Sequence, residues 1–88
     1  MRIIFHRQCD KDLARLKKSG WKMEPFIEFL HECQHWPLHA KYKAHELLGN
    51  RQGIWDIHIR QNWIVLLKKE GNAITLLRTG THASLGIG

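Results

Sequence analysis

The alternation of apolar and polar residues is clearest at residues 54–60, in the second half of the chain. Apolar Trp55, Ile57 and Ile59 are interleaved with polar residues, and neighbouring side chains of a strand point to opposite faces. The pattern therefore predicts a half-buried strand. Its polar face carries Asp56, His58 and Arg60. An acid, an imidazole and a guanidinium at two-residue spacing make this face a candidate site, with an ordinary solvated face as the alternative.

Further strands are predicted on both sides of residues 54–60. Residues 61–62 form a two-residue hairpin turn, and the apolar run 63–68 is typical of a strand in the middle of a sheet. A second turn at residues 70–72 leads to a strand at 73–78, and the N-terminal residues 2–5 fit another short strand.

Two helices are predicted between the first strand and residues 54–60. The first begins at a cap on Asp10 and continues through Ser19, with Gly20 as its left-handed stop. The second begins near Pro25 and ends at Trp36, because Pro37 disfavours a helical conformation at the residue before it. The expected buried stripes are Cys9, Leu13 and Leu16 in the first helix and Phe26, Phe29, Leu30 and Cys33 in the second.

These elements predict a single α+β domain of residues 1–88 with the order β-α-α-β-β-β. The three C-terminal strands form an antiparallel meander that the first strand joins, and both helices pack on one face of this antiparallel-rich sheet. The other face stays partly open, and the polar side of residues 54–60 should point to it. Residues 38–53 form the longest irregular segment; Leu47 and Leu48 are expected to hold it to the core and to leave His45 at the surface.

Composition narrows the function classes. Fourteen Lys and Arg against eight Asp and Glu give a formal charge of +6, which attracts polyanions, above all nucleic acid, although solubility alone is the simpler interpretation. No stretch approaches the roughly 20 apolar residues that span a bilayer or resembles a secretory signal, so a cytosolic protein without membrane association is expected. Cys9 and Cys33 have neither metal-site nor disulfide spacing and are expected to be small buried hydrophobes.

Three histidines and an arginine suit phosphodiester cleavage without a metal ion. One group takes the proton of a ribose 2′-OH, another protonates the departing 5′-oxygen, and a cation stabilises the charge that develops on the phosphoryl group. Imidazole serves both proton steps because its ordinary pKa lies near neutral pH. The candidates are His45, His58, His82 and Arg78, with Asp56 orienting His58.

A metal site is the competing use of histidine in this chain. His31 and His35 have i, i+4 spacing and His39 follows the proline, an arrangement that could hold zinc or nickel in a metal-dependent or metal-sensing protein. No fixed fourth ligand is visible, so solvated histidines are expected, and neither a metal nor another cofactor is predicted.

The segments HELLG at 45–49, WDIHI at 55–59 and LRTGTHASL at 77–85 resemble the YafQ branch of the RelE-like toxins of bacterial toxin–antitoxin modules. The resemblance covers the whole chain and implies a RelE-like fold. It also implies an endoribonuclease, an mRNA interferase that cuts messenger RNA in the ribosomal A site, inhibits translation and is silenced by a cognate antitoxin protein. The catalytic residues that it implies are His45, Asp56, His58, Arg78 and His82. The cations expected to hold RNA on the 70S ribosome are Lys11, Arg15, Lys18, Lys41, Lys43, Arg51 and Arg60.

Two positions depart from the family pattern. Asn62 stands where YafQ-like proteins usually carry an acid, and Gly86 stands where they commonly place an aromatic residue. An amide cannot accept a proton as a carboxylate can, and glycine cannot stack on a base. A slower nuclease that depends more on His45 or His82 as its base is therefore expected. The alternative is an attenuated or non-catalytic RNA- or DNA-binding module on the same fold.

Overall fold

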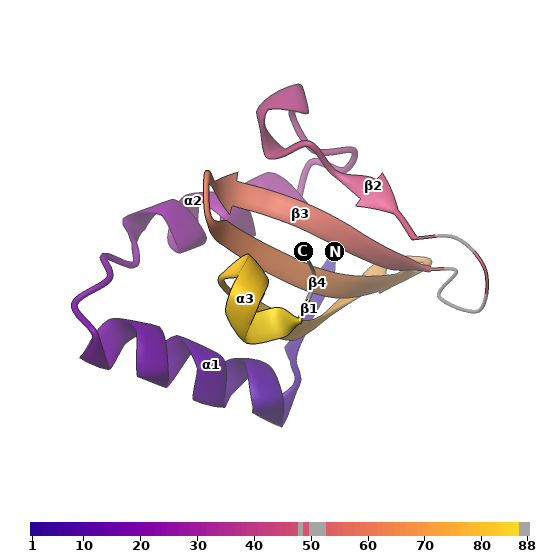
Figure 1. The fold of residues 1–88 in the computed structure, drawn as a ribbon. Coiled ribbons are helices and arrows are strands. Elements are labelled where there is room, and N and C mark those ends of the chain that lie inside the picture. The colour runs from indigo at the N-terminus through magenta and orange to yellow at the C-terminus, as the bar shows by residue number, and fades with distance from the viewer. Residues whose placement is uncertain (48, 50–52, 87–88) are drawn as a thin grey trace.

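One mixed sheet with the strand order β1-β5-β4-β3-β2 organises the protein in the computed structural model (Figure 1). The structure describes residues 1–47, 49 and 53–86. The strands are β1 (Arg2–Phe5), β2 (His45–Glu46), β3 (Ile54–Arg60), β4 (Trp63–Glu70) and β5 (Ala73–Gly80). β1 is parallel to β5, and the other neighbours are antiparallel. The predicted α+β class and the β-α-α-β-β-β order are confirmed, with the two-residue strand β2, a 3₁₀ helix and a short C-terminal helix as additions.

The helices are α1 (Arg7–Lys18), α2 (Glu24–Cys33), the 3₁₀ helix η1 (Ala40–Tyr42) and α3 (His82–Leu85). α1 begins before the predicted cap at Asp10, because the His6 side chain accepts the backbone N–H of Gln8 and caps the helix instead. No helix in the described ranges is long and apolar enough to cross a membrane.

The end of α2 corrects a second predicted boundary. The helix ends at Cys33 and not at Trp36. Gln34 and His35 donate their backbone N–H groups to the carbonyls of His31 and Glu32, three residues back, so the last turn tightens before Pro37 is reached. His31 and His35 consequently do not share one helix.

The core lies between the two long helices and one face of the sheet. Cys9 of α1 and Phe26, Phe29 and Cys33 of α2 pack in one buried cluster with alternate residues of the central strands. The predicted stripes are thus confirmed, with Leu13, Leu16 and Leu30 partly buried at the margin. The strand residues of this cluster are Ile57, Ile59, Trp63, Val65, Leu67, Ile74 and Leu76.

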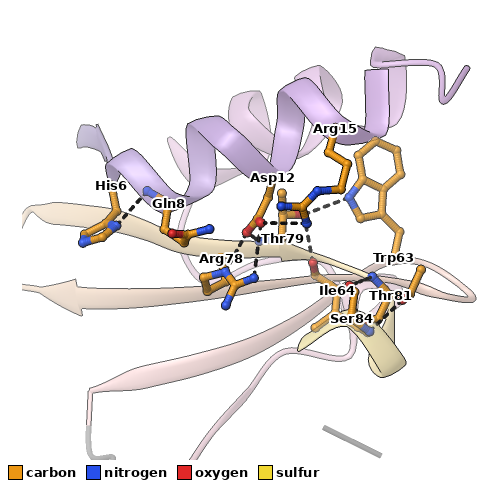
Figure 2. Close-up of polar contacts among 10 residues, drawn as sticks. All are labelled: His6, Gln8, Asp12, Arg15, Trp63, Ile64, Arg78, Thr79, Thr81 and Ser84. Carbon is orange, nitrogen blue, oxygen red and sulfur yellow. Dashed lines mark hydrogen bonds and ion pairs between the residues drawn. The ribbon is translucent and has the colours of Figure 1, made fainter. Parts of the chain in front are cut away.

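The opposite face of the sheet is partly covered by α3, which lies in front of the strands in Figure 1. Ile64 points to this face, because it pairs with His58 and Gly80 and not with core residues, yet it is fully buried. α3 starts in a capping box in which Thr81 and Ser84 exchange side-chain and backbone hydrogen bonds (Figure 2). The tight return onto the sheet needs a glycine at position 80, since a Cβ there would lie 2.5 Å from Ser84 Oγ.

Candidate active site

The register of the sheet brings the predicted site residues into adjacent rows. His45 on β2 pairs with Asp56 on β3, and Asp56 pairs with Leu66 on β4, which pairs in turn with Arg78 on β5. Paired residues point to the same face, so His45, Asp56 and Arg78 belong to one row across the open face. His58 begins the next row, opposite Ile64.

Asp56 lies between two imidazoles. Its Oδ2 is 3.7 Å from His45 Nε2, and its Oδ1 is 3.6 Å from His58 Nε2. His45 is exposed, as expected, whereas Asp56 and His58 are mostly covered, with 17% and 25% of their side chains exposed. Asp56 Oδ1 is buried and has no hydrogen-bond partner among the described residues. This oxygen is therefore an acceptor placed beside His58 Nε2.

His82 reaches the same cluster from α3. Its ring centroid is 5.6 Å from that of His58, and the His58 centroid is 6.5 Å from that of His45. On its other side, His82 Nδ1 lies 3.0 Å from Oδ1 of Asn62 in the β3–β4 turn, and the backbone N–H of His82 donates to the same oxygen at 3.3 Å. The three histidines predicted from the sequence are therefore neighbours in space.

Arg78 is held by a residue that the sequence analysis missed. Its Nε donates to Asp12 Oδ2 at 2.7 Å and its Nη2 to Asp12 Oδ1 at 3.2 Å, and the backbone N–H of Thr79 donates to the same carboxylate at 3.0 Å (Figure 2). Asp12 is 2% exposed. The hydrogen bond to Asp12 raises the pKa of the Arg78 guanidinium above its ordinary value, so Arg78 stays charged.

The position of Asp12 on the buried side of α1 could have identified it from the sequence. Cys9, Leu13 and Leu16 define the buried stripe at i, i+4 and i+7, and Asp12 occupies the remaining i+3 position of that stripe. An acid at a buried helical position needs a cationic or N–H partner. The sequence pattern does not say which of the chain's arginines and lysines provides it.

Arg78 and α3 line a common hollow on the open face. This cavity has a volume of about 360 Å³, and Leu85 and Gly86 are among its lining residues. No hydrogen bond or ion pair joins Arg78 to the three histidines within the described ranges. The remaining lining residues are Leu47, Ile54, Leu66 and Leu77.

A second hollow, of about 290 Å³, adjoins His58 and is lined by the cations Lys41, Lys43 and Arg60. The prediction for Arg60 from strict alternation needs correction, because the register shifts between His58 and Arg60 and places Arg60 opposite Trp63 at the strand end. Lys41 is already paired: its Nζ donates to Glu28 Oε1 at 2.7 Å, which raises the pKa of Lys41 and lowers that of Glu28.

The other predicted cations are not brought to this hollow. Lys11, Arg15 and Lys18 are exposed on α1, which packs on the side of the sheet that holds the core, and Arg15 lies 3.7 Å from Asp12. Arg51 and Leu48 lie outside the described residues. Leu47 is half-buried, as predicted for a residue that holds its segment to the core.

The metal-site hypothesis gains no support from the arrangement of the histidines. His31, His35 and His39 are exposed, and the side chain of His39 instead caps η1 by accepting the N–H of Lys41. In residues 1–47, 49 and 53–86, no group of three or more His, Cys, Asp and Glu side chains could hold a metal ion.

Known proteins show the same fold and sequence pattern. The family described as bacterial toxin of type II toxin–antitoxin system, YafQ, matches residues 1–86. The mRNA interferase toxin YafQ of Escherichia coli K12 is 43% identical over 85 residues, which cover 94% of this chain and 92% of that protein. These matches define the class of the chain as a toxin of a type II toxin–antitoxin system. Within that class it belongs to the YafQ family.

Solved structures agree with this assignment. The crystal structure of YafQ from E. coli BL21(DE3) has a TM-score of 0.86 and 30% identity, covering 97% of this chain and 98% of that one. YafQ in the E. coli DinJ–YafQ toxin–antitoxin complex has a TM-score of 0.87 and 32% identity, covering 94% of this chain and 93% of that one. The similarity therefore extends over nearly the whole fold.

Proposed function

We propose that this protein is an endoribonuclease that cleaves messenger RNA in the ribosomal A site and so inhibits translation in the cytoplasm. One observation carries the proposal: His45, His58 and His82, which are far apart in the sequence, lie together on the open face of the sheet, with His45 and His58 beside Asp56 and His82 beside His58. The names of the E. coli relatives, which are mRNA interferase toxins, support the same reaction class.

The proposed reaction is attack of a ribose 2′-oxygen on the adjacent phosphorus. One imidazole removes the 2′-OH proton while the new oxygen–phosphorus bond forms. The bond from phosphorus to the 5′-oxygen breaks, and a second imidazole protonates that oxygen. The products are a 2′,3′-cyclic phosphate and a 5′-hydroxyl. Arg78, kept charged by Asp12, stabilises the negative charge of the transition state, so the scheme requires no metal ion.

The hollow beside His58 is proposed as the path of the RNA backbone towards the imidazoles. Lys43 and Arg60 line it and provide positive charges for phosphate contacts, whereas Lys41 forms an ion pair with Glu28. Lys11, Arg15, Lys18 and Arg51 are proposed as further contacts with ribosomal RNA. By analogy with the DinJ–YafQ complex, we also propose that a cognate antitoxin binds and silences this protein.

Ribosomes programmed with a defined message, followed by toeprinting, test the reaction. Wild type is expected to cut in the A-site codon and to leave a 5′-hydroxyl. His45→Ala, His58→Ala and His82→Ala should each slow cleavage by about 10²- to 10⁴-fold, the usual contribution of a proton-transfer group. His35→Ala, at an exposed position outside the histidine cluster, is the matched control and should cleave like wild type.

Two further results would change the proposal. Full cleavage by all three alanine variants would remove the histidines from the chemistry. Salt-sensitive RNA binding without cleavage would replace the nuclease with the non-catalytic binding module.

Metal independence is tested by treating the toxin alone with EDTA and removing the chelator before ribosomes are added; unchanged cleavage is the expected result. Because Asn62 and Gly86 depart from the family pattern, a lower rate than that of the E. coli relatives is also expected.

A further inference from the structure

The contact between Asn62 and His82 determines which nitrogen of His82 carries a hydrogen. The backbone N–H of His82 and its ring Nδ1 both face Asn62 Oδ1, at 3.3 and 3.0 Å. A backbone N–H only donates, so the amide atom that it faces is the carbonyl oxygen and not the NH₂ group. An amide oxygen only accepts. Nδ1 of His82, which shares this oxygen, must therefore be protonated.

This tautomer leaves the lone pair of a neutral His82 on Nε2. The amide of Asn62 is uncharged, and it stabilises an imidazolium less than a carboxylate would. Among the described residues, Lys43 is the one residue other than glycine with positive φ, so the conformation of the β3–β4 turn does not itself require asparagine at position 62. The role of the Asn62 side chain is therefore its contact with His82.

The other two imidazoles have different partners. His45 Nδ1 lies 3.2 Å from the backbone carbonyl of Lys43, which only accepts, so this nitrogen also carries a hydrogen. The Nε2 atoms of His45 and His58 both face the carboxylate of Asp56, at 3.7 and 3.6 Å. An ionised carboxylate only accepts, so an Nε2 atom that bears a hydrogen is the form that suits this contact. These two rings are therefore suited to donate a proton.

We propose that Asn62 is a positioning residue that fixes His82 as the general base and leaves the acid role to the pair of imidazoles on Asp56. This inference rests on the proposed nuclease function. Nε2 of His82 takes the proton of the 2′-OH, and His45 or His58 gives a proton to the departing 5′-oxygen. Among the described residues, the titratable group in contact with His82 is His58 of β3, with Asp56 beyond it, and Arg78 of β5 belongs to the same face without a hydrogen bond to His82.

Nitrogen-15 NMR of the imidazoles reads the tautomer without any need for catalysis. In its neutral form, wild-type His82 is expected to show a protonated Nδ1 and an unprotonated Nε2. Asn62→Leu, which has a similar size but no acceptor, should lose this preference and cleave at least about tenfold more slowly at unchanged KM. A wrong histidine tautomer costs about 10⁴-fold in a serine protease, which sets the upper bound. Asn72→Leu, in the exposed β4–β5 turn, is the matched control.

Asn62→Asp separates the tautomer from the charge. Aspartate keeps an acceptor for Nδ1 and is expected to retain the tautomer, but its charge holds a proton on His82, so the acidic limb of the pH–rate profile should move to higher pH. Wild type that cleaves while His82 carries its hydrogen on Nε2, or Asn62→Leu that cleaves like wild type, would overturn this inference alone. Wild type that shows the expected tautomer but cleaves no message on ribosomes would overturn the proposed function and the base role with it.

Discussion

Asp12 and Arg78 are joined by two parallel hydrogen bonds, from Nε to Oδ2 at 2.7 Å and from Nη2 to Oδ1 at 3.2 Å, across 66 positions of sequence. The same carboxylate accepts the backbone N–H of Thr79, at the part of β5 that extends beyond its pairing with β1. A paired fork of this kind restricts the guanidinium to one orientation. The first helix thereby fixes the position of the cation that we assign to the transition state.

Replacing Asp12 with asparagine should weaken both the fold and cleavage. Asparagine can still accept the N–H of Thr79 but loses the charge that holds Arg78, and hydrogen bonds to charged groups contribute about 1.5–3 kcal/mol. Because 35% of the Arg78 side chain is exposed, we expect the lower part of this range. Urea unfolding measures the loss. Asp10→Asn, exposed on the same helix, should change the free energy of unfolding by less than about 0.5 kcal/mol.

In cleavage assays, Asp12→Asn should lower kcat more than it raises KM, since Arg78 acts on the transition state in the proposed mechanism. A variant with wild-type stability and wild-type kcat would show that the ion pair has neither role.

Gly80→Ala should move α3 and reduce cleavage. The added Cβ would lie 2.5 Å from Ser84 Oγ, closer than such atoms approach, so the Ser84 hydroxyl must leave the capping box or the first turn of α3 must shift, and we expect either change to displace His82. The double variant Gly80→Ala with Ser84→Ala removes the conflicting hydroxyl and should recover part of the cleavage rate. Ser84→Ala alone controls for the lost capping box. A Gly80→Ala protein with full activity would show that the placement of His82 tolerates this displacement.

Lys43→Gln should weaken RNA binding and lower its salt dependence. Each phosphate contact with a single strand contributes about −0.7 to the slope of log K against log salt, so the loss of one contact should reduce the slope by about that amount. Lys22→Gln removes an exposed charge outside the hollow and is the matched control. Filter binding of a short RNA over a salt series measures both slopes. Equal slopes for the two variants would remove Lys43 from the RNA path.

The two buried thiols predict a loss of stability at alkaline pH. Burial raises the pKa of Cys9 and of Cys33 from 9.0 to about 12. Above about pH 9 the unfolded chain releases these protons while the folded chain retains them, so the stabilisation is complete below pH 9 and is lost as the pH rises towards 12. Each thiol contributes a slope of up to about 1.4 kcal/mol per pH unit.

Urea unfolding between pH 7 and 11 tests this effect. Lysines and tyrosine also titrate in this range, so the comparison of interest is Cys33→Ala, which should show a shallower decline than wild type. Parallel declines would contradict the assigned cause.

Local sequence patterns predicted most of the fold, because the periodicity that forms a strand or a helix lies within a few consecutive residues. The strict alternation at residues 54–60 correctly placed Asp56 and His58 on the open face. The predicted two-residue turn at Gln61-Asn62 is also present in the structure. The same alternation failed at Arg60, since a register shift between paired strands depends on the partner strand as well as on the sequence of β3.

The features that the sequence did not predict depend on contacts between distant segments. His6 is an unusual helix cap. The partner of Asp12 is Arg78 of β5, which comes close to Asp12 only in the folded chain. α3 has four residues, too few for a helical period, although Thr81 and Ser84 at capping-box spacing were a usable sign of its start. The expectation that Asn62 merely weakens the nuclease overlooked its contact with His82, which only the folded chain shows.

The parallel pairing of β1 with β5 has a consequence for biosynthesis. Arg2 pairs with Ala73 and Phe5 with Leu76, so the first strand to leave the ribosome finds its neighbour only after nearly the whole polypeptide has been made. The imidazole of His82 arrives later still. In the proposed mechanism, a nascent chain therefore lacks a complete set of proton-transfer groups until β5 and α3 have been made.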